Sequence, residues 1–78
     1  MPIYYFNVYN DEVSMDPEGL ELADVDTARA FALKAARSLG ADSVLHGHLI
    51  GSHRVEIVDE NQKPVGSIRF DEAVEIKP

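Results

Sequence analysis

The feature that most constrains the fold is one amphipathic segment whose apolar stripe is largely alanine. Apolar residues recur in it every three or four positions: Val25, Ala28, Phe31, Ala32, Ala35, Ala36 and Leu39. This spacing predicts a helix over residues 24–39, and its small side chains allow the helix to lie close to a sheet. Asp24 is the expected N-cap. Gly40 predicts a break or kink, followed by a short helical turn over residues 42–46.

A strand is predicted before this helix, over residues 3–9, which are rich in aromatic and β-branched side chains. Tyr4, Phe6 and Val8 alternate onto one face, which we expect to be the core face. Residues 13–15 are expected to return as a short second strand. The following Asp16-Pro17-Glu18-Gly19 is a turn signal, and Leu20 and Leu22 are expected on the same returning ribbon.

A second hairpin is predicted after the helix. Two further segments carry alternating apolar residues, 53–60 and 65–70. If all their apolar side chains face one core, Ile57 lies opposite Ile68 and Val55 lies opposite Phe70. At the end of the chain, Val74 and Ile76 alternate with charged residues. We expect this tail to extend the sheet or to add an edge strand.

These segments together predict one α+β domain over residues 1–78. Its architecture is hairpin–helix–hairpin, with a small, mainly antiparallel four-stranded sheet and one main helix packed on one face. The expected core includes Tyr4, Phe6, Val8, Val25, Ala28, Ala32, Leu39, Val55, Ile57, Ile68 and Phe70. A chain of 78 residues buries a modest share of its surface, so we expect modest stability.

Three motifs in the chain resemble those of a known family. The start follows M-P-x-Y-[FY]-F-x-V, from Met1 to Val8, and the centre follows D-x-E-G-x-E-L-x-D-x-x-x-A-R, from Asp16 to Arg29. The second hairpin and the tail also fit, except that Gln62 stands where the family has a turn glycine. The chain therefore resembles a short, mostly alphaproteobacterial family of proteins that is catalogued as a domain of unknown function. The resemblance implies a hairpin–helix–hairpin fold and no particular activity.

The charge of the chain is strongly acidic and uneven. The chain contains fourteen acidic and seven basic residues, for a net charge of −7. Residues 1–26 contain seven of the acids and no Lys or Arg. This surface would repel phosphate, so we expect no nucleic-acid partner. The acidic segment predicts a docking surface for a basic partner or a weak divalent-cation site. It is also typical of a solvated loop followed by a helix N-terminus.

The sequence contains no motif that predicts catalysis or a cofactor. It has no cysteine, no nucleophile elbow and no phosphate-binding glycine loop. Three histidines, His46, His48 and His53, are the candidate metal ligands, with Asp42 or Asp59 to complete a set. A surface loop explains the same histidines, and we expect no metal site. The chain is therefore expected not to be an enzyme and to hold no cofactor.

The function favoured by these observations is a small protein-interaction domain that associates with itself. The outer face of the first strand carries Ile3, Tyr5 and Tyr9, which are the expected interface. The alternative is an antitoxin-like regulator with a partial RNase-H-like fold that binds a basic partner protein. No 20-residue apolar segment and no signal-peptide pattern occur, so we expect no membrane partner and a cytoplasmic location.

Overall fold

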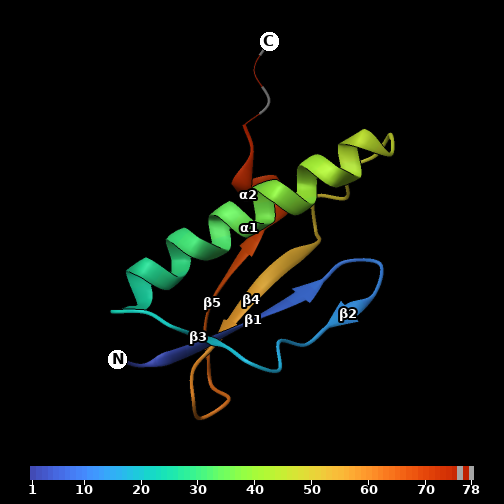
Figure 1. The fold of residues 1–78 in the computed structure, drawn as a ribbon. Helices are drawn as coiled ribbons and strands as arrows, with labels where there is room; N and C mark the ends of the chain where they lie inside the picture. The colour runs from blue at the N-terminus through green and yellow to red at the C-terminus, as the bar shows by residue number, and fades with distance from the viewer. Residues whose placement is uncertain (76, 78) are drawn as a thin grey trace.

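The computed structural model describes residues 1–75 and 77. Its elements, in chain order, are β1 (Ile3–Tyr9), β2 (Val13–Ser14), β3 (Leu20–Glu21), α1 (Val25–Leu45), β4 (Arg54–Val58), β5 (Pro64–Arg69) and α2 (Phe70–Ala73). All strand pairs are antiparallel in the order β2-β1-β4-β5, and β3 also pairs with β1. Helix α1 crosses one face of this sheet (Figure 1). The predicted α+β fold is confirmed, with five strands in place of four.

The fifth strand arises because the chain after β1 returns in two short pieces. Strand β2 pairs with the end of β1, where Val8 lies opposite Ser14. Strand β3 pairs with the beginning of β1, where Tyr4 lies opposite Leu20. The turn between them contains Gly19, whose φ of 74° is in the left-handed region that favours glycine. One returning ribbon is therefore split by the turn that the sequence predicts.

Helix α1 is not broken at Gly40, so the prediction of a break there was wrong. The helix continues to Leu45, so the turn expected over residues 42–46 is its last part and His46 is its C-cap. Gly40 is buried, and a Cβ built there would lie 3.5 Å from Cδ1 of Leu49. The chain after the helix thus packs back over this glycine. At the other end of α1, Asp24 is the N-cap, as predicted, and its carboxylate accepts a hydrogen bond from the Thr27 N–H at 2.8 Å.

The register of the second hairpin differs by two residues from the predicted one. Val55 lies opposite Ile68, and Ile57 lies opposite Gly66. The register differs because Phe70 is not part of the strand. It is the first residue of α2, where its side chain is 1% exposed. The glycine opposite Ile57 also leaves room for the helix, because a Cβ there would lie 2.8 Å from a guanidinium nitrogen of Arg29. A β-bulge after Ile57 shifts the register once more near the end of this strand pair.

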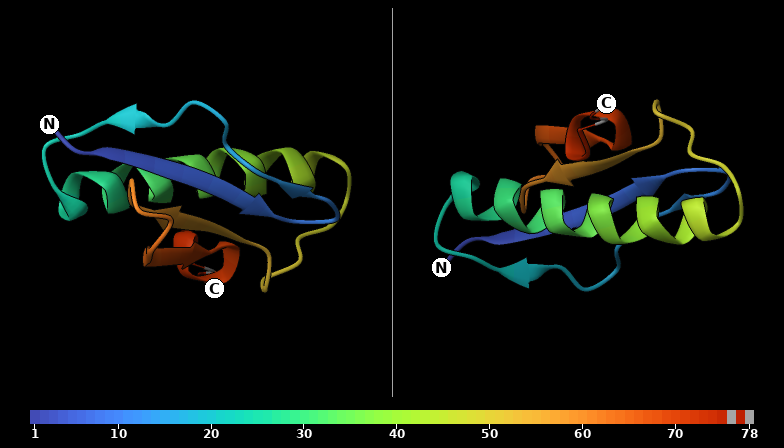
Figure 2. Two further views of the ribbon diagram at one scale, coloured as in Figure 1. Left: turned by 90° about the horizontal axis from the view of Figure 1, so that it is seen from below. Right: turned by 90° about the horizontal axis from the view of Figure 1, so that it is seen from above.

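The core lies between α1 and the sheet. The two views of Figure 2 show α1 lying across one face of the strands. Seven of the predicted core residues are buried: Tyr4, Ala28, Ala32, Val55, Ile57, Ile68 and Phe70. Ala36, on the predicted apolar stripe of the helix, is buried as well. Phe6, Val8 and Leu39 are only partly buried and pack against this cluster. Val25 is exposed, which corrects the prediction, because it stands in the first turn of α1 at the margin of the sheet.

The end of the chain does not form the expected edge strand over its described part. Residues Phe70–Ala73 form the short helix α2, which contacts α1, and Val74 is exposed. Arg37 of α1 fixes this helix by donating a hydrogen bond from Nε to the carbonyl of Ala73 at 2.7 Å. The predicted partner of Val74, Ile76, lies outside the described residues.

Candidate functional site

The least regular part of the sheet is the edge arm, which we define as residues 10–21. Strands β2 and β3 of this arm pair with the two ends of β1, so the middle of β1 has a neighbouring strand, β4, on its other edge only. A carboxylate occupies the edge without a strand: Oδ2 of Asp16 accepts a hydrogen bond from the Phe6 N–H at 3.2 Å. The Asp16 N–H in turn donates to Oδ1 of Asn7 at 2.9 Å. The arm is thus attached to the middle of β1 through side chains.

The same carboxylate closes the turn of the edge arm. Oδ1 of Asp16 accepts hydrogen bonds from the N–H groups of Glu18 and Gly19, both at 3.1 Å. Burial raises the pKa of Asp16, but the backbone N–H bonds from Gly19, Phe6 and Glu18 together lower it below its usual value. The ionised form is therefore the one that holds the arm in place.

The arm covers part of the outer face of β1, where the interface residues were predicted. A Cβ on Gly19 would lie 2.6 Å from Cγ2 of Ile3 and 2.9 Å from Cε1 of Tyr5. Both side chains are half-buried. Tyr9 is also half-buried: Cζ of Arg54 lies 4.2 Å from its ring centre, and its hydroxyl donates to Glu56 at 3.3 Å. The assignment of Ile3, Tyr5 and Tyr9 to an interface stays a prediction.

On the inner face of the sheet, an apolar margin lies between α1 and the edge arm. Phe31 of α1 stacks on Phe6 of β1 with ring centres 4.7 Å apart, yet Phe31 is 43% exposed. Leu20 of β3 pairs with Tyr4 and shares its face, so it lies diagonal to Phe6, and it is 39% exposed. We call Phe6, Leu20 and Phe31 the apolar margin. Phe6 is half-buried, so the exposed apolar area of this margin comes from Phe31 and Leu20.

Acidic residues accompany the apolar margin along the chain. Five of the seven acids of residues 1–26 belong to the edge arm, Asp24 is the N-cap of α1, and Asp26 lies in its first turn. Asp16 and Asp24 have structural partners, and Asp11 lies 3.8 Å from His53. The remaining four have exposed side chains for which residues 1–75 and 77 supply no hydrogen bond or ion pair: Glu12, Glu18, Glu21 and Asp26. This side of the molecule therefore combines apolar contact area with unpaired negative charge.

Sequence comparison assigns the chain to a family. A sequence model of DUF6894, a domain of unknown function, matches residues 3–71. The chain belongs to this family. The matched part of the DUF6894 domain begins with β1 and ends in α2, so it includes the edge arm and the apolar margin. No curated protein and no solved structure matches the chain. The alphaproteobacterial origin and the motifs of the resemblance stay predictions.

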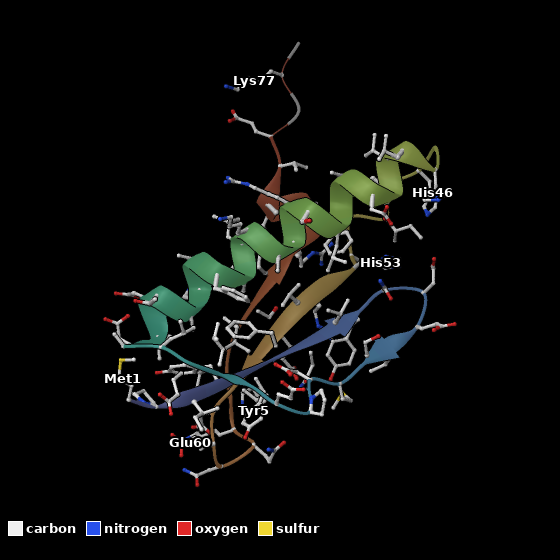
Figure 3. The ribbon with its side chains drawn as sticks, in the orientation of Figure 1. Met1, Tyr5, His46, His53, Glu60 and Lys77 are labelled. Carbon is white, nitrogen blue, oxygen red and sulfur yellow. The ribbon has the colours of Figure 1, made fainter. Side chains whose placement is uncertain are left out.

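The three histidines of the DUF6894 domain are in different settings. His46 caps α1 and its Nδ1 lies 2.8 Å from the carbonyl of Asp42, whereas His48 is exposed in the turn that follows. His53 is half-buried against Phe70, with ring centres 5.8 Å apart. Figure 3 shows His46 at the tip of α1 and His53 beside the start of β4. Within the described residues, no three His, Cys, Asp or Glu side chains are grouped to hold a metal ion.

Two features of this site were not predicted from the sequence. Asp16 is predicted only as a turn residue, but it also stands in for a strand neighbour of β1. Phe31 is predicted on the apolar stripe, but it lies at the margin of that stripe and remains exposed. A polar Asn7 in the middle of an apolar strand is the one sequence signal for the first feature, because a buried amide needs a hydrogen-bond partner.

Proposed function

We propose that this DUF6894 domain is a non-enzymatic interaction domain whose edge arm and apolar margin bind a basic partner protein. The observation that carries the proposal is the location of the charge. Residues 1–26 carry seven acids and no Lys or Arg, whereas residues 27–78 carry seven acids and seven bases, so the first segment accounts for the whole net charge of −7. That segment forms the side of the sheet on which the exposed apolar margin lies.

A basic partner suits this surface for two separate reasons. Exposed carboxylates attract a positively charged chain over a range of about 10 Å at ordinary salt, which speeds association and selects against acidic partners. The affinity then comes from the apolar contacts of Phe31 and Leu20, because exposed ion pairs alone contribute little. A segment with lysine or arginine on one side and apolar residues on the other meets both requirements.

The absence of catalysis is part of the proposal. The chain has no cysteine, and within the described residues every buried side-chain nitrogen and oxygen has a hydrogen-bond partner. An interaction role agrees with such a satisfied interior. The structure holds no helix, within residues 1–75 and 77, that is long and apolar enough to cross a membrane. A cytoplasmic location and the antitoxin-like alternative, which shares the basic partner, stay predictions.

Calorimetric titration of the full chain with defined peptides tests the proposal. The probe is an amphipathic helical peptide of leucine and lysine, and the control peptide has glutamate in place of lysine. We expect only the basic peptide to bind, and Phe31→Ser to weaken it about tenfold, or about 1.4 kcal/mol. Leu45→Ser is the matched control, because Leu45 is 84% exposed at the far end of α1. Equal binding of both peptides, or equal effects of the two variants, would contradict the proposal.

Self-association is the second candidate, and the half-buried aromatic residues Tyr5 and Tyr9 favour it. The two candidates differ in the sign of the salt effect. Two copies with a charge of −7 repel each other, so salt should strengthen a dimer, whereas salt should weaken binding to a basic partner. Sedimentation of the chain alone at several salt concentrations measures the first effect. A monomer at high micromolar concentration in all salts would exclude the self-association candidate.

A further inference from the structure

A hollow of about 370 Å³ opens at the start of β1, beside Tyr4, whose cross-strand partner Leu20 belongs to the apolar margin. Pro2, Ile3, Val25 and Val65 supply apolar side chains to its lining. The neighbouring Asp59 and Glu60, from the turn between β4 and β5, supply carboxylates. Figure 3 shows Glu60 at the same end of the molecule as Met1, opposite the end that carries His46. The hollow therefore offers apolar walls next to negative charge.

Both carboxylates are held in place by backbone groups. Oε1 of Glu60 accepts a hydrogen bond from the Ile3 N–H at 2.9 Å. Oδ1 of Asp59 accepts hydrogen bonds from the N–H groups of Asn61 at 2.8 Å and Lys63 at 3.0 Å. No group in the described part of the chain hydrogen-bonds to the second oxygen of either carboxylate. Each of them thus keeps one oxygen with which to accept a hydrogen bond from a ligand.

The sign of the charge that fits the hollow follows from its surroundings. The N-terminus of α1 is adjacent, at Val25, and a free helix N-terminus would favour an anion. Asp24 already occupies that position, because its carboxylate accepts from the Thr27 N–H, and Asp26 adds a second negative charge. The side chain of Lys63 forms no ion pair within residues 1–75 and 77. The four carboxylates around the hollow outnumber the two positive groups at the same end, the Lys63 side chain and the Met1 amino group, so the local charge is negative.

We propose that this hollow binds an alkylammonium group. The methylene chain would lie along Ile3, Val25 and Val65, and the ammonium would donate hydrogen bonds to Asp59 and Glu60. The ligand is either a free alkylamine or the lysine side chain of a polypeptide, because both present the same chemistry. The inference rests on the hollow alone and does not depend on the proposed binding of a basic partner at the edge arm.

Amide chemical shifts of the ¹⁵N-labelled full chain test this inference with three small probes. Pentylammonium chloride carries both the chain and the charge, pentanol carries only the chain, and ammonium chloride carries only the charge. We expect saturable shifts with pentylammonium, centred on the amides of Ile3, Val25, Asn61 and Val65, and at least fivefold weaker binding of the other two probes. Pentanol binding as tightly as pentylammonium would overturn the assignment, as would shifts scattered over the whole surface.

Charge-neutralising variants locate the ammonium. Glu60→Gln and Asp59→Asn keep an oxygen for the backbone N–H groups, and each should weaken pentylammonium at least threefold. Glu12→Gln is the matched control, since it removes the same charge beyond the other end of β1. Equal effects of Glu60→Gln and Glu12→Gln would overturn the proposal. Nα-acetyl-lysine amide separates the sources: binding with the same shifts identifies a lysine side chain, and binding of pentylammonium alone identifies a free amine.

Discussion

At the scale of single residues, the attachment of the edge arm depends on Asp16. Its carboxylate accepts hydrogen bonds from three backbone N–H groups, those of Phe6, Glu18 and Gly19. Asp16→Ala leaves all three without this acceptor, and we expect it to lower the free energy of unfolding by about 2 kcal/mol. Asp16→Asn keeps one side-chain oxygen as an acceptor and should lower the free energy of unfolding by a smaller amount. Urea unfolding measures both, and Glu18→Ala, which removes an exposed acid, should change stability by less than about 0.5 kcal/mol.

Gly19 offers a second test at this scale, with another glycine as its control. Both Gly19 and Gly47 have positive φ, at 74° and 93°. Alanine at Gly19 would also collide with Ile3 and Tyr5, whereas nothing lies within 4 Å of a Cβ at Gly47. Gly47→Ala should therefore lower the free energy of unfolding by about 1 kcal/mol, from backbone strain alone. Gly19→Ala should lower it by about 1–3 kcal/mol more, because of the collision. Equal melting temperatures for the two variants would show that the arm does not pack on β1 as described.

At the scale of elements, Gly40 tests whether α1 is one continuous helix. A Cβ at this position would make an ordinary van der Waals contact with Leu49 at 3.5 Å. Alanine favours a helix interior over glycine by about 1 kcal/mol, so Gly40→Ala should stabilise the domain by about 0.5–1 kcal/mol. Thermal unfolding followed by circular dichroism measures the change. Destabilisation by this substitution would indicate that the helix is interrupted at residue 40.

The elements also show how far the sequence predicts this fold. The alanine stripe, the Asp24 cap and the alternation in β1 are local patterns, and each correctly predicts its element. The register of β4 and β5 depends instead on tertiary packing. Facing positions alone favour Phe70 in the strand, but the domain buries it as the first residue of α2. The packing of Leu49 beside Gly40 is likewise a tertiary contact, which no helical period reveals.

The candidate site was less predictable than the fold for a similar reason. The acidic segment is visible directly in the sequence, and the hypothesis of a basic partner is based on it. The exposure of Phe31 does not, because it depends on how far α1 lies toward β4 and β5 and leaves the side of β1 uncovered. The hollow near Glu60 is formed by three separate segments that meet only in the folded chain. A sequence pattern indicates which face of a single helix or strand is apolar, whereas these two sites are formed where several elements meet.

At the scale of the whole molecule, three carboxylates link stability to pH. Backbone bonds lower the pKa of Asp16 despite its burial, the Thr27 N–H and hydroxyl lower the pKa of Asp24, and the Arg69 guanidinium lowers that of Asp71. A folded-state pKa below the unfolded value of about 3.9 means that the unfolded chain binds more protons in acid. Their stabilisation is therefore complete above about pH 4 and is lost as the pH falls through the lower folded values.

We expect the urea midpoint to fall between pH 5 and pH 2.5. Below its isoelectric point of about 4.7 the chain also becomes net positive, and this growing repulsion acts in the same direction. Comparison with Asp16→Asn and Asp24→Asn separates the two effects, because each variant should show a shallower loss of stability in acid. Parallel pH profiles for the wild type and both variants would contradict the linkage.

The charge distribution of the whole molecule makes the edge arm the surface on which the account depends. The most direct test is a map of amide chemical shifts for the ¹⁵N-labelled full chain titrated with the leucine–lysine peptide. We expect the largest shifts at Phe6, Leu20 and Phe31, and we expect them to shrink as salt is raised from 50 to 500 mM. Shifts centred on Tyr9 and Arg54 of the outer sheet face, or shifts that salt leaves unchanged, would contradict the proposed function.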